Sequence, residues 1–382
     1  MSPAKRAAAR SDGLPKHRRL YQHLKDAIAQ GVYSPGERLP TENALIDEFG
    51  VSRTTVVRAL HDLEHEGVLV RRRGSGSYVS EEHGARRRTF GLIATGLFPD
   101  ANTGNNIFSQ VFQEMSRLAG AKNCALLTGS PLDESDPDAL VAEVTEVATR
   151  YASHALDGVF FMPLMVPADR MAANRRITDM LKKTGVPTVL IDRDTEPYPG
   201  RSEFDLVGID NLDAGWVVTR HLLSLGCKRI HFVCSSRVKS TVSARVLGWR
   251  LALEDAGLEA KAAFLHVGDV NDDAFVLSSI KAARAEAFVC EHDGVAMTAI
   301  RLAREAKIKV PKRIRIVGFD GSPLGEHISV PLTTMRQPVQ AIAETAVRVM
   351  LERLEDPRMP VRDIRIAAEL VVRRSCGSRN GR

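Results

Sequence analysis

The feature that most constrains the fold is a regular alternation of two sequence patterns over residues 89–376. Short apolar runs rich in β-branched residues predict buried strands at 90–96, 124–129, 158–162, 187–192, 229–234, 287–290 and 313–319. Segments of helical periodicity predict helices at 107–121, 138–153, 211–225, 243–256, 293–306 and 338–354. Strands that alternate with helices form right-handed βαβ crossovers and a parallel sheet covered on both faces. Because there are too many strands for one small sheet, we expect two α/β lobes, divided near residues 195–240.

The first eighty residues have a different sequence pattern, which predicts three short helices. Apolar residues at helical spacing from Leu20 to Ile28 indicate the first helix. The second begins after Thr41 as its N-cap and ends at Gly50, and the third begins after Ser52. Two short helices joined by a turn, the second with a polar outer face, form a helix-turn-helix. The second helix of this motif fits the major groove of DNA.

Residues 71–79, which read RRRGSGSYV, admit two interpretations. One is a solvated, flexible linker, and the other is a β-hairpin whose tip approaches a phosphate backbone. The preceding helix-turn-helix favours the hairpin, with Gly74, Ser75 and Gly76 at the tip, because glycine tolerates the positive φ of a tight turn. Residues 1–88 hold 16 Lys and Arg against 11 Asp and Glu, a net charge of +5 out of +6 for the chain. This asymmetry predicts a polyanion-binding head on a neutral body.

These patterns divide the chain into four parts. Residues 1–16 are small, basic and polar and predict a disordered arm. Residues 17–80 form the helical head with its hairpin. Residues 81–88 are charged and contain glycine, which predicts a linker. Residues 89–376 form the α/β body.

Cysteine usage and hydropathy indicate the compartment. The five cysteines are odd in number and form no C-x-x-C pair, so we expect neither a disulfide framework nor a zinc site. The first 13 residues lack the apolar core of a signal peptide, and no stretch approaches the ~20 apolar residues of a membrane helix. We therefore expect a cytoplasmic protein with no membrane partner.

Residues 35–79 resemble the winged helix of the GntR family of bacterial regulators. The shared pattern is P-G-x-x-L-P-[ST]-E, then V-S-R-x-T-V, then a wing that ends G-x-G-x-[FY]-V. The resemblance implies phosphate contacts from Arg38 and Thr41, positions at or near bases for Asn43, Ser52, Arg53 and Thr54, and minor-groove contacts from Arg73 and the tip Gly74, Ser75 and Gly76.

One position departs from the GntR pattern. The family usually has a basic residue directly after T-V, where this chain has Val57, and Arg58 follows one position later. Either Arg58 replaces the usual arginine, or Val57 contacts a thymine methyl group instead. The alternative to DNA binding is that the helix-turn-helix is part of an ordinary helical domain, and the wing in register argues against it.

The body resembles the effector domain of LacI/GalR-type repressors, which is built like periplasmic sugar-binding proteins. The matching segments include VGIDNLDAGWVVTRHLLSLG at 207–226, SARVLGWRLALEDAG at 243–257 and IVGFDGSPLGEHISVPLTTMRQP at 316–338. The resemblance implies a sugar between the two lobes, at the carboxyl ends of the strands. Its implied contacts are hydroxyl binding by Arg245 and Asp320, second-lobe lining by His292 and Asp293, an apolar wall from Phe108, and Asn105 at the family's Asn position.

Individual positions in this cleft have other interpretations. Asp293 could instead cap the helix that follows it, and His292 could be a structural histidine. Arg245 could instead pair with a surface carboxylate. The chain also has His292 where the family has Asn, and Asn106-Ile107 where it has Pro-Phe. The ligand therefore need not be a common hexose.

Together, the two resemblances predict a DNA-binding transcription regulator, most simply a repressor of carbohydrate genes. We expect a homodimer on a palindromic operator, controlled by a small sugar, as in the arabinose-repressor type of regulator. Whether the sugar releases or recruits DNA stays open. The alternatives are a transport-type sugar-binding protein and an enzyme. The chain contains no G-x-S-x-G, H-E-x-x-H or P-loop motif, and we expect no catalytic residue, cofactor or metal.

Overall fold

A computed structural model of the chain describes residues 15–29, 31–72, 74–80, 88–95, 107–129, 137–154, 156–165, 172–236 and 240–378. Residue contacts divide the chain into two compact units, Met1–Arg88 and Thr89–Arg382. We describe each unit by itself and call them the head and the body. Most of the predicted arm and linker, and with them residues Arg73 and Asn105, lie outside the described residues.

The head is a three-helix unit with a hairpin. Its helices are α2 (Lys16–Ala29), α3 (Glu42–Phe49) and α4 (Arg53–His65). The predicted caps are confirmed, since Thr41 accepts from the N–H of Ala44 and Ser52 from the N–H of Thr55. Gly50 follows α3 in the left-handed region with a φ of 61°, where glycine is favoured. A small apolar core holds the helices together; it includes Leu20, Leu24, Leu45, Val56, Ala59, Leu60 and Leu63.

The predicted wing is also confirmed. Strands β1 (Leu69–Arg72) and β2 (Gly76–Val79) pair antiparallel, with Leu69 opposite Val79 and Arg72 opposite Gly76. Arg38 forms an isolated bridge to Tyr78, which ties the approach to α3 to the outer edge of β2. The wing is therefore part of the folded head and not a linker.

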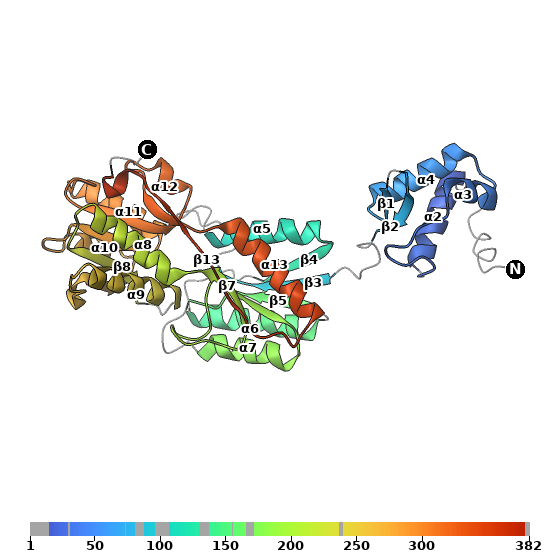
Figure 1. Cartoon of the computed structure of the whole chain (residues 1–382). Coiled ribbons are helices and arrows are strands. Elements are labelled where there is room, and N and C mark those ends of the chain that lie inside the picture. Colours follow the sequence, from blue (N-terminus) through green and yellow to red (C-terminus); the bar gives the residue numbers. More distant parts are fainter. Residues whose placement is uncertain are drawn as a thin grey trace. The chain divides into compact units, whose positions relative to one another are not determined.

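The body contains two six-stranded sheets, each the centre of one lobe (Figure 1). The first sheet has the order β13-β7-β6-β5-β3-β4, and the second has the order β14-β12-β11-β10-β8-β9. The first-sheet strands are β3 (Arg88–Ile93), β4 (Cys124–Gly129), β5 (Gly158–Phe161), β6 (Thr188–Ile191), β7 (Asp205–Ile209) and β13 (Asp363–Ile366). The second-sheet strands are β8 (Ile230–Ser235), β9 (Leu265–Gly268), β10 (Ala287–Cys290), β11 (Arg315–Asp320), β12 (Thr333–Arg336) and β14 (Glu369–Val371). The central pairs are parallel, as predicted.

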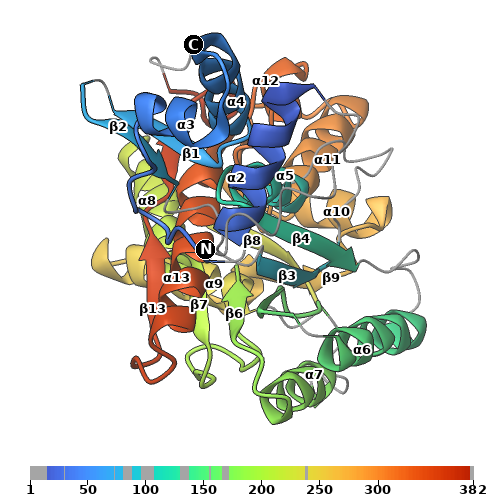
Figure 2. The same ribbon diagram turned by 90° about the vertical axis from the view of Figure 1, so that its right-hand side faces the viewer.

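Helices cover both faces of each sheet. In the first lobe, α5 (Ile107–Ala121) and α13 (Val339–Glu355) pack on one face, and α6 (Pro137–Ser153) and α7 (Ala172–Lys183) pack on the other. Figure 2 shows α6 and α7 side by side, away from α13. In the second lobe, α8 (Asn211–Ser224) and α9 (Ser240–Asp255) cover one face, and α10 (Asp273–Ile280) and α11 (Asp293–Glu305) cover the other. The short helix α12 (Leu324–His327) precedes β12.

The sequence predicted a single boundary between the two lobes near residues 195–240. The chain in fact passes between the lobes three times, and only its first passage lies in that range. The chain leaves the first lobe after β7, which ends at Ile209, and α8 then packs in the second lobe. After β12 it returns, because α13 packs against α5, β6 and β7 and β13 pairs with β7. It crosses a third time to place β14 beside β12. The C-terminal return was missed because a local pattern predicts an element but not its partner.

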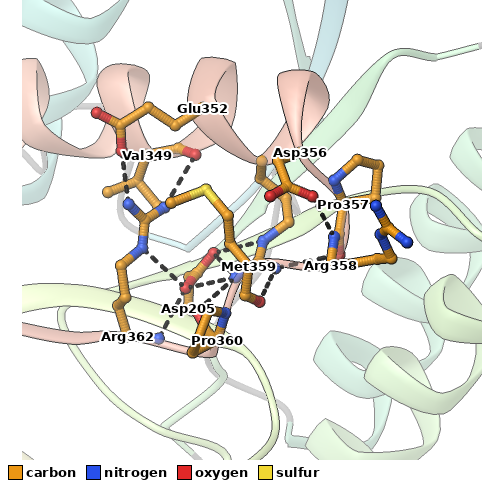
Figure 3. Close-up of polar contacts among 10 residues, drawn as sticks. Asp205, Val349, Glu352, Asp356, Pro357, Arg358, Met359, Pro360 and Arg362 are labelled. Atoms are coloured by element: carbon orange, nitrogen blue, oxygen red, sulfur yellow. Dashed lines mark hydrogen bonds and ion pairs between the residues drawn. The ribbon is translucent and has the colours of Figure 1, made fainter.

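A buried carboxylate fixes this return, as Figure 3 shows. Asp205, the first residue of β7, accepts from Arg353 Nε at 3.0 Å and Arg353 Nη2 at 3.1 Å. It also accepts from the backbone N–H of Arg362, next to β13, at 2.8 Å. Arg353 in turn donates to the carbonyls of Pro357 and Pro360 in the turn after α13. We call Asp205, Arg353 and Arg362 the return clamp. It holds helix, turn and strand against the first lobe.

Candidate DNA-binding surface and effector cleft

The outer face of α4 carries the polar side chains predicted to read DNA. Arg53, Thr54, Val57, Arg58 and His61 surround one shallow surface hollow, together with Asp62. The opposite face of α4 buries Val56, Ala59, Leu60 and Leu63 in the core. Helical geometry alone therefore presents Val57 and Arg58 on the same exposed side as Arg53.

The start of α4 is arranged around Ser52. Its hydroxyl lies 2.9 Å from Thr54 Oγ1 and 2.8 Å from Thr55 Oγ1 while it caps the helix. Asn43, Ser52 and Thr54 are exposed. An exposed helix N-terminus carries partial positive charge and favours phosphate oxygens. The predicted base and phosphate contacts at this end therefore share one accessible patch.

Glu42 organises two of the basic side chains. Its carboxylate lies 3.4 Å from Arg53 Nε and 2.6 Å from Arg71 Nη2. The Arg53 side chain remains 75% exposed despite this contact, so it is available to a second partner. Sequence reasoning did not identify Glu42 as the residue that links α4 to the wing.

Gly74, Ser75 and Gly76 form the tip of the wing, as predicted, while Arg73 lies outside the described residues. Gly74 and Gly76 have φ values of 75° and 119°, which explains glycine at both positions. Ser75 Oγ lies 2.6 Å from the Tyr78 hydroxyl, and Arg72 lies over the Tyr78 ring. The guanidinium of Arg38 lies so close to Gly76 that a Cβ there would be 2.9 Å from Nε. This contact brings Arg38, predicted to bind phosphate, to the wing.

In the body, Arg245 lies on α9 in the second lobe. It is 4% exposed, donates from Nε to Asn211 Oδ1 at 2.8 Å and from Nη1 to the Glu291 carbonyl at 2.6 Å, and lies over the Phe319 ring. The interpretation of Arg245 as a surface ion pair is therefore wrong. Asn211 is a cleft residue that sequence reasoning missed, although it is part of the D-N motif that starts α8.

Asp320 lies at the end of β11 in a conformation that L-residues rarely adopt, with a φ of 109°. Such strain costs on the order of 1–3 kcal/mol and is found mainly at functional sites. Its Oδ1 accepts from Gln337 Nε2 at 2.9 Å. The strain and the strand-end position support the prediction that Asp320 contacts ligand, which no contact in the structure tests.

Asp293 has a supporting position behind Asp320. It is 1% exposed and accepts from Thr334 Oγ1 and from the N–H of Ser322, both at 2.7 Å. It does not cap α11, whose N-cap residue is His292. Burial and the negative charge of Asp320 raise the pKa of Asp293 to about 8. Asp293 thus holds the turn that follows Asp320, and direct ligand contact by Asp293 stays a prediction.

His292 lies beside a buried carboxylate. Its Nε2 is 3.5 Å from Glu291 Oε1, and its side chain is 37% exposed. Glu291 accepts at Oε2 from the N–H of Ser235 at 2.8 Å. A Cβ at Gly294 would lie 3.0 Å from the His292 ring, so the missing side chain leaves room for the ring. The histidine is thus held in place and partly accessible, which fits both its structural and its ligand-binding interpretation.

The first-lobe wall is built on Phe108 from α5. Arg193 lies over the Phe108 ring at 5.1 Å and pairs with Asp192 at 2.7 Å. Both residues directly follow β6. Phe108 therefore supports an arginine, and a direct contact between its ring and a sugar stays a prediction.

A small hollow is lined by residues of both lobes. The first lobe contributes charged side chains, and the second lobe contributes Asn211 and the start of α9. Its polar lining residues are Asp192, Arg193, Asp194, Tyr198, Arg201, Asn211, Ser240, Thr241, Asp363 and Arg365. None of the sequence-predicted ligand residues is in this lining, and Arg245 is connected to it through Asn211.

Comparisons with known proteins agree with both units. Residues 16–79 match the family model for bacterial regulatory proteins of the gntR family, and residues 219–376 match a periplasmic binding protein-like domain. The chain is 26% identical over 375 residues to an arabinose metabolism transcriptional repressor of Geobacillus stearothermophilus, covering 95% of this chain and 98% of the relative. It is also 32% identical over 222 residues to the transcriptional regulator MalR of Streptomyces coelicolor, covering 56% of this chain and 62% of the relative.

Solved structures show the same fold. A complex of the transcriptional regulator CelR with cellobiose has a TM-score of 0.62 at 20% identity and covers 88% of this chain and 100% of that one. The regulator CcpA of Lactococcus lactis has a TM-score of 0.64 at 20% identity, covering 76% and 99%. No helix in the described part of the chain is long and apolar enough to cross a membrane. The chain joins a GntR-type winged helix-turn-helix domain to a periplasmic-binding-protein-like domain, the architecture of a DNA-binding transcription regulator.

Proposed function

We propose that the protein is a repressor of carbohydrate genes whose DNA affinity is set by a small sugar bound between the lobes of the body. The observation that carries the proposal is the hollow shared by the two lobes, whose charged lining residues form ion pairs with one another. A hydroxyl group both donates and accepts, so it suits a wall in which carboxylates alternate with guanidinium groups. A charged ligand would gain less binding energy, because each opposite charge in the wall is already neutralised by its ion-pair partner.

On the DNA side, we propose that α4 enters the major groove and the wing follows the adjacent backbone. The exposed Arg53 and the capped N-terminus of α4 support base contacts, and the Arg38–Gly76 approach supports phosphate contact at the wing. One head reads few base pairs, so we infer a homodimer on a palindromic operator. Since its target is chromosomal DNA, we place the protein in the cytoplasm.

Ligand control requires that the lobes move relative to one another. The backbone N–H of Asp194 in the first lobe lies 3.3 Å from Ser240 Oγ at the start of α9 in the second lobe. A ligand held by both lobes favours the arrangement that it fits, and the coupling is typically ~1–3 kcal/mol. Several relatives are named transcriptional repressors, which supports repression as the output of this protein.

The test is fluorescence anisotropy of the full chain on labelled DNA from its own upstream region, at one fixed salt concentration. L-Arabinose, ribose, cellobiose, hexoses and uronic acids are added in turn. We expect tight DNA binding and release by one sugar. Binding of DNA that no sugar alters would contradict sugar control, and failure to bind any upstream DNA would contradict the repressor assignment.

A further inference from the structure

The segment that joins β6 to β7 is unusual for two neighbouring parallel strands. Such pairs are normally connected by a helix, whereas here residues 192–204 cross over without one. Six residues of this segment line the hollow: Asp192, Arg193, Asp194, Tyr198, Gly200 and Arg201. Long connections without secondary structure are uncommon in compact domains and are often functional. We call residues 192–204 the crossover segment.

The crossover segment is fastened by a buried carboxylate. The side chain of Asp194 is 3% exposed and accepts from the N–H of Glu196 at 3.0 Å and from the N–H of Ser202 at 3.1 Å. Arg201 Nη1 lies 3.2 Å from the same carboxylate. Asp194 therefore closes the segment into a loop and holds Arg201 at the hollow.

A second carboxylate reaches Arg201 from the C-terminal return. Asp363 Oδ2 lies 3.3 Å from Arg201 Nη1 and 2.8 Å from Arg365 Nη2. Pairing of β13 with β7 places Asp363 beside Leu206 and Arg365 beside Gly208, and these four residues line the hollow. The return clamp at Asp205 fixes this register, since Arg362 directly precedes Asp363.

The chemistry of this wall suits a pair of hydroxyl groups. Arg201 is 31% exposed and meets both carboxylates through Nη1, so the N–H groups of its Nε and Nη2 can serve a ligand. A hydroxyl can accept from this guanidinium while its neighbour donates to Asp363. A carboxylate or phosphate would also face Asp194 and Asp363, which disfavours an anionic group at this end.

We infer that Arg201 and Asp363 form a second hydroxyl-binding subsite, so that the effector is an uncharged saccharide of two or more linked rings. This inference rests on the proposed function. Asn211 lines the hollow and binds Arg245, which connects the hollow to the strand ends where Asp320 lies. A saccharide with one ring at the strand ends and a second ring against the crossover segment would contact both the strand-end residues and the proposed subsite.

The experiment is isothermal titration of the full chain with matched pairs of sugars. Glucose is compared with cellobiose and maltose, galactose with lactose, arabinose with arabinobiose, and xylose with xylobiose. We expect one disaccharide to bind at least tenfold more tightly than its own monosaccharide. In Arg201→Gln and Asp363→Asn, this advantage falls to less than threefold while the affinity for the monosaccharide stays within twofold.

The control is Arg301→Gln on α11, because Arg301 also lies between two carboxylates, Asp273 at 2.7 Å and Glu305 at 3.2 Å, but outside the hollow. This variant should bind every sugar as the parent does. Melting temperature and DNA affinity show that each variant is folded. Arg201→Lys keeps the charge but loses the planar guanidinium, so its preference for the disaccharide should lie between that of the parent and that of Arg201→Gln.

Three results would overturn the inference. A monosaccharide that binds and releases DNA as well as any disaccharide would refute the subsite and leave the proposed function standing. An equal loss for both sugars of a pair in Arg201→Gln would show that Arg201 serves the fold or a single-ring site. If no sugar bound while DNA binding persisted, the subsite and sugar control would both be wrong.

Discussion

Replacing Asp205 with asparagine should destabilise the body far more than removal of an ordinary ion pair. The Asp205 side chain is 2% exposed, and the structure gives it three short contacts from Arg353 and the Arg362 backbone. An asparagine keeps one acceptor oxygen but loses the charge and leaves Arg353 partly unpaired. Breaking a buried charge pair in this way costs about 3–5 kcal/mol. The return of α13 and β13 to the first lobe depends on these contacts.

The two tryptophans make the assay specific for the body. Trp216 and Trp249 both lie in the second lobe, so urea unfolding followed by their fluorescence does not report on the head. Asp273→Asn is the matched control, because Asp273 also accepts two hydrogen bonds from one arginine but its side chain is 55% exposed. It should cost at most about 1 kcal/mol. A loss below about 1 kcal/mol for Asp205→Asn, equal to that of the control, would refute the clamp.

The other predictions concern the two sites and their pH dependence. Arg53→Ala should weaken DNA binding at least tenfold in anisotropy while sugar binding stays unchanged, whereas a loss of both would contradict separate sites. Arg245→Lys should abolish the sugar response and leave DNA affinity intact; an unchanged response would exclude Arg245 from the cleft. The raised pKa of Asp293, about 8 against 3.8 when unfolded, means that the folded body binds the extra proton. Its contribution to stability is therefore full below about pH 4 and is lost as pH rises through 8. In Asp293→Asn, the urea midpoint of unfolding should vary less with pH between pH 5 and 9 than it does in the parent. Midpoints that change with pH in parallel for parent and variant would refute this.

The head could be predicted closely because its signals are local. The caps Thr41 and Ser52, the turn at Gly50 and the glycines of the wing each act within a few residues, and all are found in their predicted roles. The Glu42 contacts could not be predicted, since they join Arg53 and Arg71 from separate elements. A side chain's partner across the fold leaves no periodic signal in the sequence.

In the body, most buried strands were predicted, although β7 and β12 were missed, and the site was predicted in part. Strands such as 158–162 and 287–290 are continuous apolar runs, and the structure confirms them as β5 and β10. Edge strand β13 alternates exposed and half-buried residues, and helix α7 follows a strand without a clear boundary signal; neither was predicted. Because Asp363 and Arg365 lie on β13, the wall that they form with Arg201 was also missed.

The positions of the interlobe crossings suggest how ligand contact is converted into lobe movement. Asn211 directly follows the first crossing and accepts from Arg245, while Gln337, at the second crossing, donates to Asp320 at 2.9 Å. At the third crossing, the Ile366 carbonyl accepts from the N–H of Asp210, which ties it to the first. Two of the proposed ligand residues, Arg245 and Asp320, are therefore hydrogen-bonded to the segments that must bend when the lobes rotate. A ligand that moves Arg245 or Asp320 by a fraction of an ångström changes hydrogen bonds of the interlobe segments directly. Ligand binding can therefore drive rotation of the lobes without a chain of intermediate residues.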